Sequence, residues 1–336
     1  MAEPLLEVRN LKVHFPTEDG LVKAVDGVSF QVAPGQTLGV VGESGSGKSV
    51  TFLTVMGLIQ QKQAVIEGEV IFQGQDLLKL PVDEMRGIRG AKMGMVFQDP
   101  MSSLHPFFKV GDQIVEAIRT HQNISKKEAL DLAIDMLRRV GIPRPDERAN
   151  QYPHEYSGGM RQRAMIAMAL VLNPDLLIAD EPTTALDVTV QAQILDLIDR
   201  LREEFNAAVV IITHDLGVVA EHCDEIQVMY AGKAVEYGDA RDIYYSALHP
   251  YTWGLLQSIP RLGMETERLN PIKGLPPSLI FVPSGCSFHP RCPYVFDKCR
   301  VDVPELIPAN GHHASACHLA LADKERIFKE EVAQHS

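Results

Sequence analysis

The fold of this chain is decided by Gly42-Glu43-Ser44-Gly45-Ser46-Gly47-Lys48-Ser49, which fits G-x-x-x-x-G-K-[ST], the spacing of a phosphate-binding loop. Residues 37–41 form a mostly apolar run suited to a buried strand, and residues 49–59 suit a buried helix. Glycines let backbone N–H groups converge on phosphates, and the helix N-terminus adds a favourable dipole. We therefore predict an α/β nucleotide-binding fold whose phosphate contacts come from Gly42, Ser44, Gly45, Gly47, Lys48 and Ser49.

The last two residues of this loop have distinct predicted roles. Lys48 would neutralise charge on the β- and γ-phosphates of the nucleotide, and the Ser49 hydroxyl would bind Mg²⁺. A purely structural glycine turn is the alternative explanation, and it leaves the motifs that follow in the chain unexplained.

Length and composition limit the class of protein. The 336 residues suggest about two domains, and a hydrophobic content of 45% allows a sizeable core. The net charge of −12 argues against a nucleic-acid surface, so no nucleic-acid partner is expected. No signal peptide is recognisable at the start, and the longest apolar run, residues 164–172, is too short to span a membrane. We expect a soluble, cytoplasmic protein that reaches a membrane only through a partner.

The strand and helix patterns place further motifs around the loop. Residues 5–15 and 24–32 alternate as strands of an antiparallel sheet, and Phe15 is either a ring that stacks on adenine or a core residue. A later strand, residues 93–97, ends at Gln98. Amphipathic helices then indicate a helical insertion over about residues 99–165.

Two predicted apolar strands are each followed directly by polar residues. Residues 176–179 are followed by Asp180 and Glu181. Asp180 would hold Mg²⁺ through its water shell, and Glu181 would orient or deprotonate the attacking water. The strand at 208–212 leads to His214, at the strand end where α/β proteins place ligand contacts, so we expect it to contact the γ-phosphate.

Taken together, these residues resemble an ABC-type ATPase cassette, with a RecA-like core, an antiparallel β subdomain and a helical subdomain. The match includes SGGMRQR at 157–163 as the signature, although Tyr156 and Met160 replace the usual Leu and Gln. The ATP-contacting residues that the resemblance implies, beyond the loop itself, are Phe15, Gln98, Ser157, Gly158, Gly159, Asp180, Glu181, Asp187 and His214. Gln98 would join Ser49 and Asp180 around Mg²⁺, and Glu181, His214 and Gln98 would be the catalytic residues.

Several longer stretches of the sequence resemble the ATP-binding subunits of bacterial peptide permeases. The resemblance is greatest to the oligopeptide type, and the dipeptide and nickel types share most of the same stretches. The stretches that carry this resemblance are FQDPMSSLHP at 97–106, YPHEYSGGMRQR at 152–163, DEPTTALDVTVQAQI at 180–194, THDLGVVA at 213–220, HPYTWGLL at 249–256 and GCSFHPRCPY at 285–294. It implies a nucleotide-binding domain at 1–258 and a small irregular cysteine-containing extension at 259–336.

The resemblance implies an ATPase that powers peptide import. Two cassettes would sandwich each ATP between one loop and the signature of the other, and the second cassette is expected to be a related, non-identical chain. The other expected partners are two transmembrane permease subunits and an extracytoplasmic peptide-binding protein. The chain would sit on the cytoplasmic face of the inner membrane as a peripheral subunit. Two alternatives are a soluble ABC ATPase of DNA repair or translation, and a P-loop kinase.

Four of the five cysteines crowd the extension, at Cys286, Cys292, Cys299 and Cys317. Clustered cysteines in a reducing cytoplasm indicate metal before disulfide. The gaps of five, six and seventeen residues lack a C-x-x-C pair, which weakens a zinc interpretation. Resemblance to the permease extension, some members of which hold a [4Fe–4S] cluster, favours a cluster; zinc, reduced thiols or a disulfide stay open. The four nearby histidines, at 289, 312, 313 and 318, are expected to be solvated, and the extension to act without touching ATP chemistry.

Overall fold

The computed structural model describes residues 3–60, 62–184, 186–259 and 272–333. The chain divides into two compact units. One comprises Met1–Leu5, Ala33–Gln36 and Lys79–Ile211, and the other comprises Leu6–Val32, Thr37–Leu78 and Ile212–Ser336. We call them the helical unit and the loop unit, since the first holds the predicted helical insertion and the second holds the phosphate-binding loop.

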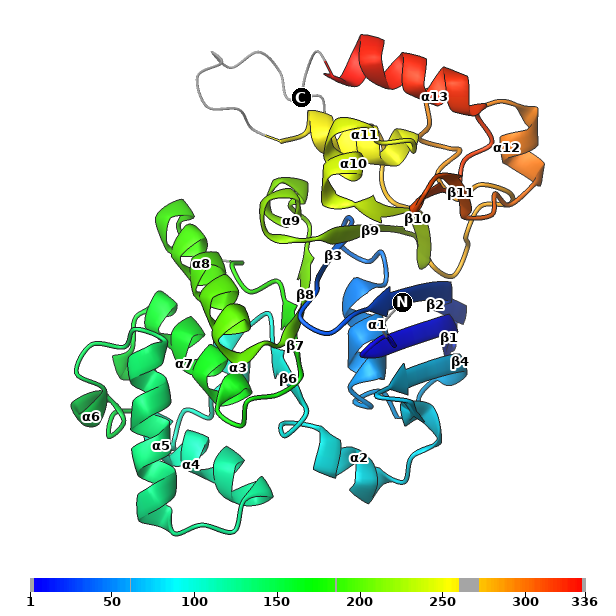
Figure 1. Ribbon diagram of the computed structural model, residues 1–336. Helices are drawn as coiled ribbons and strands as arrows, with labels where there is room; N and C mark the ends of the chain where they lie inside the picture. Colours follow the sequence, from blue (N-terminus) through cyan, green and yellow to red (C-terminus); the bar gives the residue numbers. More distant parts are fainter. Residues whose placement is uncertain (1–2, 61, 185, 260–271, 334–336) are drawn as a thin grey trace. The chain divides into compact units, whose positions relative to one another are not determined.

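The loop unit begins with the predicted antiparallel sheet, in the order β2-β1-β4-β5 (Figure 1). Its strands are β1 (Leu6–Thr17), β2 (Gly20–Val32), β4 (Val65–Phe72) and β5 (Gln75–Asp76). Along β1 the register pairs Leu6 with Val32 and Thr17 with Gly20, which confirms the hairpin that the alternating pattern predicts.

A second set of strands in the loop unit runs in the order β11-β12-β10-β9-β3. It comprises β3 (Thr37–Val41), β9 (Glu225–Tyr230), β10 (Lys233–Asp239), β11 (Ile307–Asn310) and β12 (His313–Ser315). β3 and β9 are parallel, whereas the other neighbouring pairs are antiparallel. Every residue of β3 is buried, as expected for a strand covered on both faces.

Helix α1 (Lys48–Val55) follows the phosphate-binding loop, and its Phe52 ring packs 5.4 Å from the Phe30 ring of β2. The predicted helix end at residue 59 is wrong, because Gly57 takes a left-handed conformation (φ 61°) that stops the helix. The other helices of this unit are α9 (Leu216–His222), α10 (Ala240–Tyr245), α11 (Pro250–Gln257), α12 (Asp297–Val301), α13 (Leu321–Ile327) and η3 (Phe328–Val332).

The helical unit contains strands β6 (Met93–Val96), β7 (Leu176–Asp180) and β8 (Ala208–Thr213), of which β6 and β7 are parallel. Its helices are α2 (Val82–Ile88), α3 (Pro100–Ser103), α4 (Val110–His121), α5 (Lys126–Arg139), α6 (Pro145–Arg148), α7 (Gly158–Leu170) and α8 (Val188–Phe205). Short 3-10 turns lie at η1 (Leu77–Lys79), where the chain passes from the loop unit to the helical unit, and at η2 (Pro153–Glu155). Helices α3, α4, α5 and α6 lie within the predicted helical insertion, and the bounds of that insertion stay a prediction.

The extension is more regular than its proline-rich sequence predicts. Strand β12 pairs with β10, with Glu236 opposite Ser315 and Tyr237 opposite Ala314, so the extension adds strands to the sheet of the loop unit. His313, predicted to be solvated, is 3% exposed, and its Nε2 atom lies 2.8 Å from a carboxylate oxygen of the fully buried Glu236. A buried acid needs such a partner, and this explains the position of the imidazole. The predicted domain boundary at residue 258 stays a prediction.

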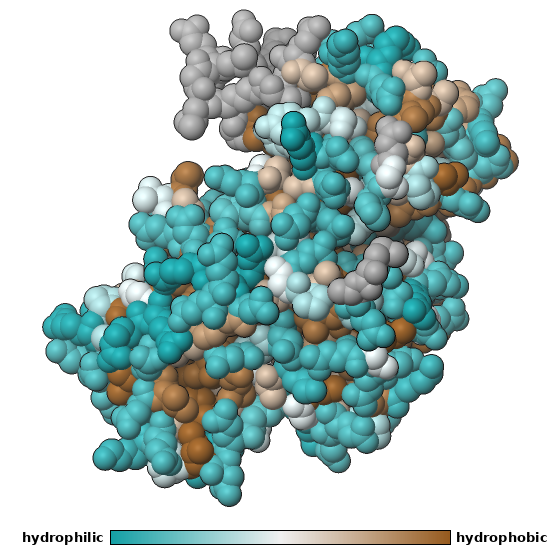
Figure 2. Space-filling view, viewed as in Figure 1, coloured by the Kyte–Doolittle hydropathy of each residue, from teal (hydrophilic) through white to brown (hydrophobic). Residues whose placement is uncertain are grey.

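Among the described residues, no helix has both the length and the apolar content that a membrane span requires. Figure 2 shows a largely hydrophilic face on which hydrophobic side chains gather over α4 and α5.

Candidate nucleotide-binding site

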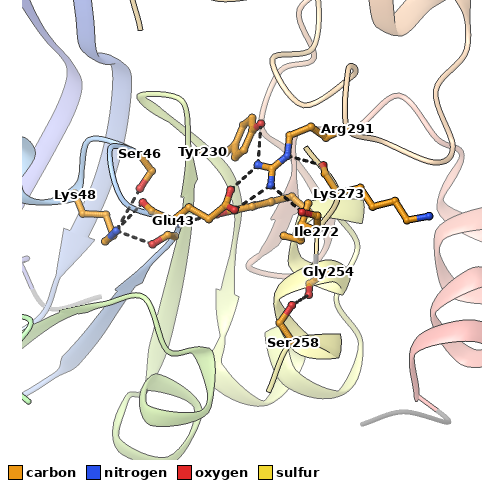
Figure 3. A network of polar contacts seen from close by, with 11 residues as sticks. Glu43, Ser46, Lys48, Tyr230, Gly254, Ser258, Ile272, Lys273 and Arg291 are labelled. Carbon is orange, nitrogen blue, oxygen red and sulfur yellow. Dashed lines mark hydrogen bonds and ion pairs between the residues drawn. The ribbon is translucent and has the colours of Figure 1, made fainter. Parts of the chain in front are cut away.

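The phosphate-binding loop is folded around the ammonium group of Lys48. This side chain is 4% exposed, and its Nζ atom donates hydrogen bonds to the carbonyl oxygens of Gly42 (2.6 Å) and Glu43 (3.0 Å) and to Ser46 Oγ (3.4 Å) (Figure 3). The loop therefore supplies acceptors that keep a buried cation satisfied. An incoming phosphate would offer stronger, charged acceptors to the same ammonium.

Two glycines of the loop are required by its geometry. Gly47 caps α1 with φ 100°, and a Cβ atom there would lie 2.2 Å from the carbonyl oxygen of Ala24. At Gly45 (φ 78°) a Cβ would meet nothing within 4 Å, and both Gly45 and Ser44 are exposed. The crest of the loop is thus open, while its base is clamped against β2. This is the arrangement that lets backbone N–H groups approach a ligand.

Three more predicted residues lie in the loop unit. Ser49 is in the first turn of α1, directly after Lys48. Phe15 lies opposite Val22 in the β1–β2 hairpin and is half-buried, which leaves part of its ring available for stacking. His214 follows the end of β8 and is exposed.

In the helical unit, the carboxylate of Glu181 is held by two neighbours. Gln98 Nε2 and Thr184 Oγ1 both donate to Glu181 Oε2, each over 2.9 Å. Glu181 has φ 47°, a left-handed conformation that costs a non-glycine residue about 1–3 kcal/mol, and such residues cluster at functional sites. Asp180, the last residue of β7, is 6% exposed. Thr184 was missed by the sequence reasoning, and its place three residues after Glu181 is the only signal that marks it.

The signature segment begins helix α7. Ser157 is the N-cap residue, and its Oγ accepts a hydrogen bond from the Met160 backbone N–H (3.3 Å). Gly158 and Gly159 follow as the first residues of the helix, so their backbone N–H groups belong to the unsatisfied first turn. A helix start of this kind favours an anion.

Asp187 takes the same capping role on the next long helix. Its Oδ1 atom accepts a hydrogen bond from the backbone N–H of Val190 (3.0 Å) at the start of α8. The structure thus assigns Asp187 a local role that does not depend on nucleotide. Its predicted contact with ATP stays a prediction.

Comparison with known proteins identifies the family. Residues 25–184 match the ABC transporter family, and residues 235–299 match the C-terminal region of oligopeptide/dipeptide transporters. The oligopeptide transport ATP-binding protein OppD of Haemophilus influenzae is 50% identical over 94% of this chain and 98% of its own length. The OppD of Escherichia coli is 52% identical over 90% of each chain. The dipeptide transport ATP-binding protein DppD of Bacillus subtilis is 52% identical over 92% of this chain and 93% of its own.

This chain belongs to the ATP-binding subunits of peptide ABC transporters. Solved structures agree with the fold. The dimeric post-hydrolysis ATP-binding cassette MJ0796, bound to ADP and Pi, covers 70% of this chain and 99% of its own, with TM-score 0.64 and 28% identity. The cbiO1 cassette of Clostridium perfringens covers 73% and 92%, with TM-score 0.62 and 25% identity.

Three of the four clustered cysteines, Cys286, Cys292 and Cys299, lie in the part of this chain that matches the peptide-transporter C-terminal region, and Cys317 lies beyond it. All four, Cys286, Cys292, Cys299 and Cys317, line one small cavity together with His249, His289 and His318. None forms a disulfide. Among the described residues, no group of three or more His, Cys, Asp or Glu side chains is arranged to hold a metal ion.

Burial disfavours the ionised form of three of these cysteines, Cys286, Cys292 and Cys317. The pKa of Cys286 is raised to about 11 and that of Cys292 to about 12, mainly by burial and in smaller part by the charge of the neighbouring cysteines. Burial also raises the pKa of Cys317. Four thiols in one cavity favour the ionised form only when a cationic group compensates their charge.

Proposed function

We propose that this chain hydrolyses ATP to power peptide import through a membrane ABC transporter. The observation that carries the proposal is the hydrogen bond from Gln98 to Glu181. Glu181 carries the carboxylate that we assign to water activation. Gln98 lies directly before the helical insertion. One contact thus joins the chemistry to the part of the chain assigned to the permease.

The residue chemistry supports each step of hydrolysis. Lys48 and His214 would stabilise charge on the γ-phosphate, and Glu181 would orient or deprotonate the water. Mg²⁺ would be held by Ser49, Asp180 and Gln98, and it would supply positive charge that neutralises the charge developing during hydrolysis. Phe15 would stack on the adenine. Gly42, Ser44, Gly45 and Gly47 would offer backbone donors to the phosphates.

A second cassette would complete each site. Ser157, Gly158 and Gly159 begin a helix whose first N–H groups suit a phosphate, and Asp187 lies at the start of the next long helix. The dimeric cassettes among the structural neighbours support this pairing. The partner in our proposal is a related, non-identical chain.

The helical insertion is the proposed contact with two transmembrane permease subunits. Phe107 and Phe108, just before α4, are 81% and 55% exposed, and such apolar surface suits a partner. An extracytoplasmic peptide-binding protein would deliver the peptide. The chain itself would be a peripheral subunit on the cytoplasmic side. A role in DNA repair or translation gains no support, because the net charge is −12 and the relatives above are named for transport.

The experiment that tests this function is purification of the affinity-tagged chain from gently solubilised membranes. Recovery of two permease subunits and a second cassette, with ATP hydrolysis stimulated by peptide-loaded binding protein, is the expected result. A chain that purifies with nucleic acid or ribosomes and without permease subunits would overturn the proposal.

For the extension we propose an iron–sulfur cluster held by Cys286, Cys292, Cys299 and Cys317. Four thiols around one cavity are the donor set of such a cluster. The spacing of these cysteines lacks the C-x-x-C pair typical of structural zinc, which favours a cluster over zinc. Chain purified without oxygen should be brown. Colourless chain with one bound zinc would overturn the cluster, and metal-free chain with a folded extension would overturn any metal.

A further inference from the structure

The phosphate-binding loop and the extension are joined by an ion pair in which the Arg291 side chain is buried and the Glu43 side chain is partly exposed. Arg291, next to Cys292, is 5% exposed, and its guanidinium binds the Glu43 carboxylate in a bidentate manner, with Nη1–Oε2 at 2.6 Å and Nη2–Oε1 at 3.0 Å. Figure 3 shows the Glu43 side chain reaching from the loop toward Arg291, with Lys48 on its other side. Both residues belong to the loop unit.

Arg291 is fixed by more than this pair. It also donates to the hydroxyl of Tyr230 (3.3 Å) and to the carbonyl oxygens of Ile272 (3.3 Å) and Lys273 (3.1 Å), which makes five hydrogen bonds in all. Its guanidinium carbon lies 5.8 Å from the centre of the Tyr230 ring. A guanidinium held by five acceptors has little freedom to turn away from Glu43.

Glu43 is held at every polar group. Its backbone N–H donates to the hydroxyl of Tyr251 (2.8 Å), and its carbonyl oxygen accepts from Lys48 Nζ (3.0 Å). Its carboxylate accepts two hydrogen bonds from the Arg291 guanidinium. The residue that contacts the phosphate-binding lysine is therefore positioned from the extension and from α11 together.

The charge of Glu43 gives this contact a consequence for the ligand. A carboxylate in a loop that receives nucleotide phosphates repels them unless a cation neutralises it. Lys48 is needed by the phosphates, so it is not available to serve Glu43 as well. Arg291 supplies the missing positive charge and keeps the carboxylate side chain in one place.

We propose that Arg291 is a positioning residue for nucleotide binding, which neutralises Glu43 and fixes the phosphate-binding loop from the extension. This rests on the proposed ATPase function. It also departs from the expectation that the extension acts without touching ATP chemistry. Because Cys286 and Cys292 belong to the same short segment as Arg291, the fold of the cysteine cavity and the affinity for ATP are linked.

The test is a charge-rescue cycle on the full-length chain, with the Kd for Mg-ATP as the readout. Arg291→Met leaves the partly buried Glu43 carboxylate without a counter-charge, and we expect it to weaken ATP binding about tenfold or more. Glu43→Gln combined with Arg291→Met removes both charges, and we expect this double variant to bind ATP within about twofold of wild type. Arg326→Met is the matched control, since Arg326 of α13 forms exposed ion pairs with Asp323 and Glu330, and it should leave the Kd unchanged.

The outcomes separate positioning from simple loss of fold. Weak binding by Arg291→Met that the double variant does not restore would assign Arg291 a structural role and overturn the proposal, as would unchanged binding. If Arg291→Met does not fold, Arg291→Lys keeps the charge but loses the bidentate fork. We then expect several-fold weaker ATP binding at an unchanged melting temperature, and unchanged binding would overturn the proposal. Failure of the wild-type chain to bind ATP would instead refute the proposed function.

Discussion

Glu181 is the residue on which the proposed chemistry depends. It follows a buried strand, takes a left-handed backbone conformation and shares one carboxylate oxygen between Gln98 and Thr184. Strain of this kind persists only where the surroundings hold the residue in place. The two hydrogen bonds are such a restraint.

Glu181→Gln should nearly abolish turnover while ATP binding survives. The amide cannot take a proton from water, and loss of a general base typically costs about 10²–10⁴-fold in rate. ATP hydrolysis and ATP binding, measured on the same assembled transporter, check this. Hydrolysis within about threefold of wild type would contradict the role given to Glu181.

Thr184→Val should lower kcat by about tenfold, because it removes one of the two hydrogen bonds that orient the Glu181 carboxylate. The affinity for ATP should not change, since Thr184 contacts the carboxylate and not the phosphate-binding loop. Thr184→Ser keeps the hydroxyl and serves as the control. Equal kcat values for the Val and Ser variants would show that this hydrogen bond is dispensable.

At this scale the sequence was informative only where chemistry restricts the residue type. Lys48 and Glu181 stand at positions where the proposed chemistry requires that residue type, so their motifs can be recognised in the sequence. Glu43 and Arg291 are different, because Glu43 occupies an unrestricted position of its motif and Arg291 is 248 residues further along the chain. Nothing local in either segment indicates that the two charges meet.

Among the elements, the extension departs most from expectation. Its strand β12 is only His313–Ser315, too short to show an alternating pattern, and yet it lengthens the sheet by pairing with β10. Long periodic segments such as α4 and α5 lie within the helical insertion that the sequence predicts, because their apolar faces repeat over several turns. Strand β12 instead places His313 against the buried Glu236 of β10, a long-range contact that no local pattern predicts.

His313→Ala should therefore loosen the extension. Glu236 would stay fully buried with only backbone N–H donors from residues 248 and 249, a loss of about 2–4 kcal/mol. We expect a lower melting temperature and faster alkylation of the cysteines in the extension. His312→Ala changes the exposed neighbour and should do neither. Identical alkylation rates for the two variants would mean that this pair does not hold the extension.

For the whole molecule, the proposal makes activity a property of an assembly. The helix start at Ser157 offers its N–H groups to a phosphate, and the proposed dimer pairs it with the loop of a second cassette. The isolated chain should consequently hydrolyse ATP slowly, and the related cassette and permease subunits should raise turnover well above the sum of the parts. High activity of a monomer, independent of concentration and verified by light scattering, would contradict composite sites.

The central claim, that ATP hydrolysis by this chain drives peptide import, is tested most directly by peptide transport in proteoliposomes. The complete transporter would be reconstituted with its nucleotide-binding side outward, and peptide with its binding protein would be enclosed in the lumen. Release of labelled peptide to the outside should require Mg-ATP and should stop in Glu181→Gln, while ATP stays bound. Peptide movement that continues at the same rate without ATP, or with Glu181→Gln, would contradict the account.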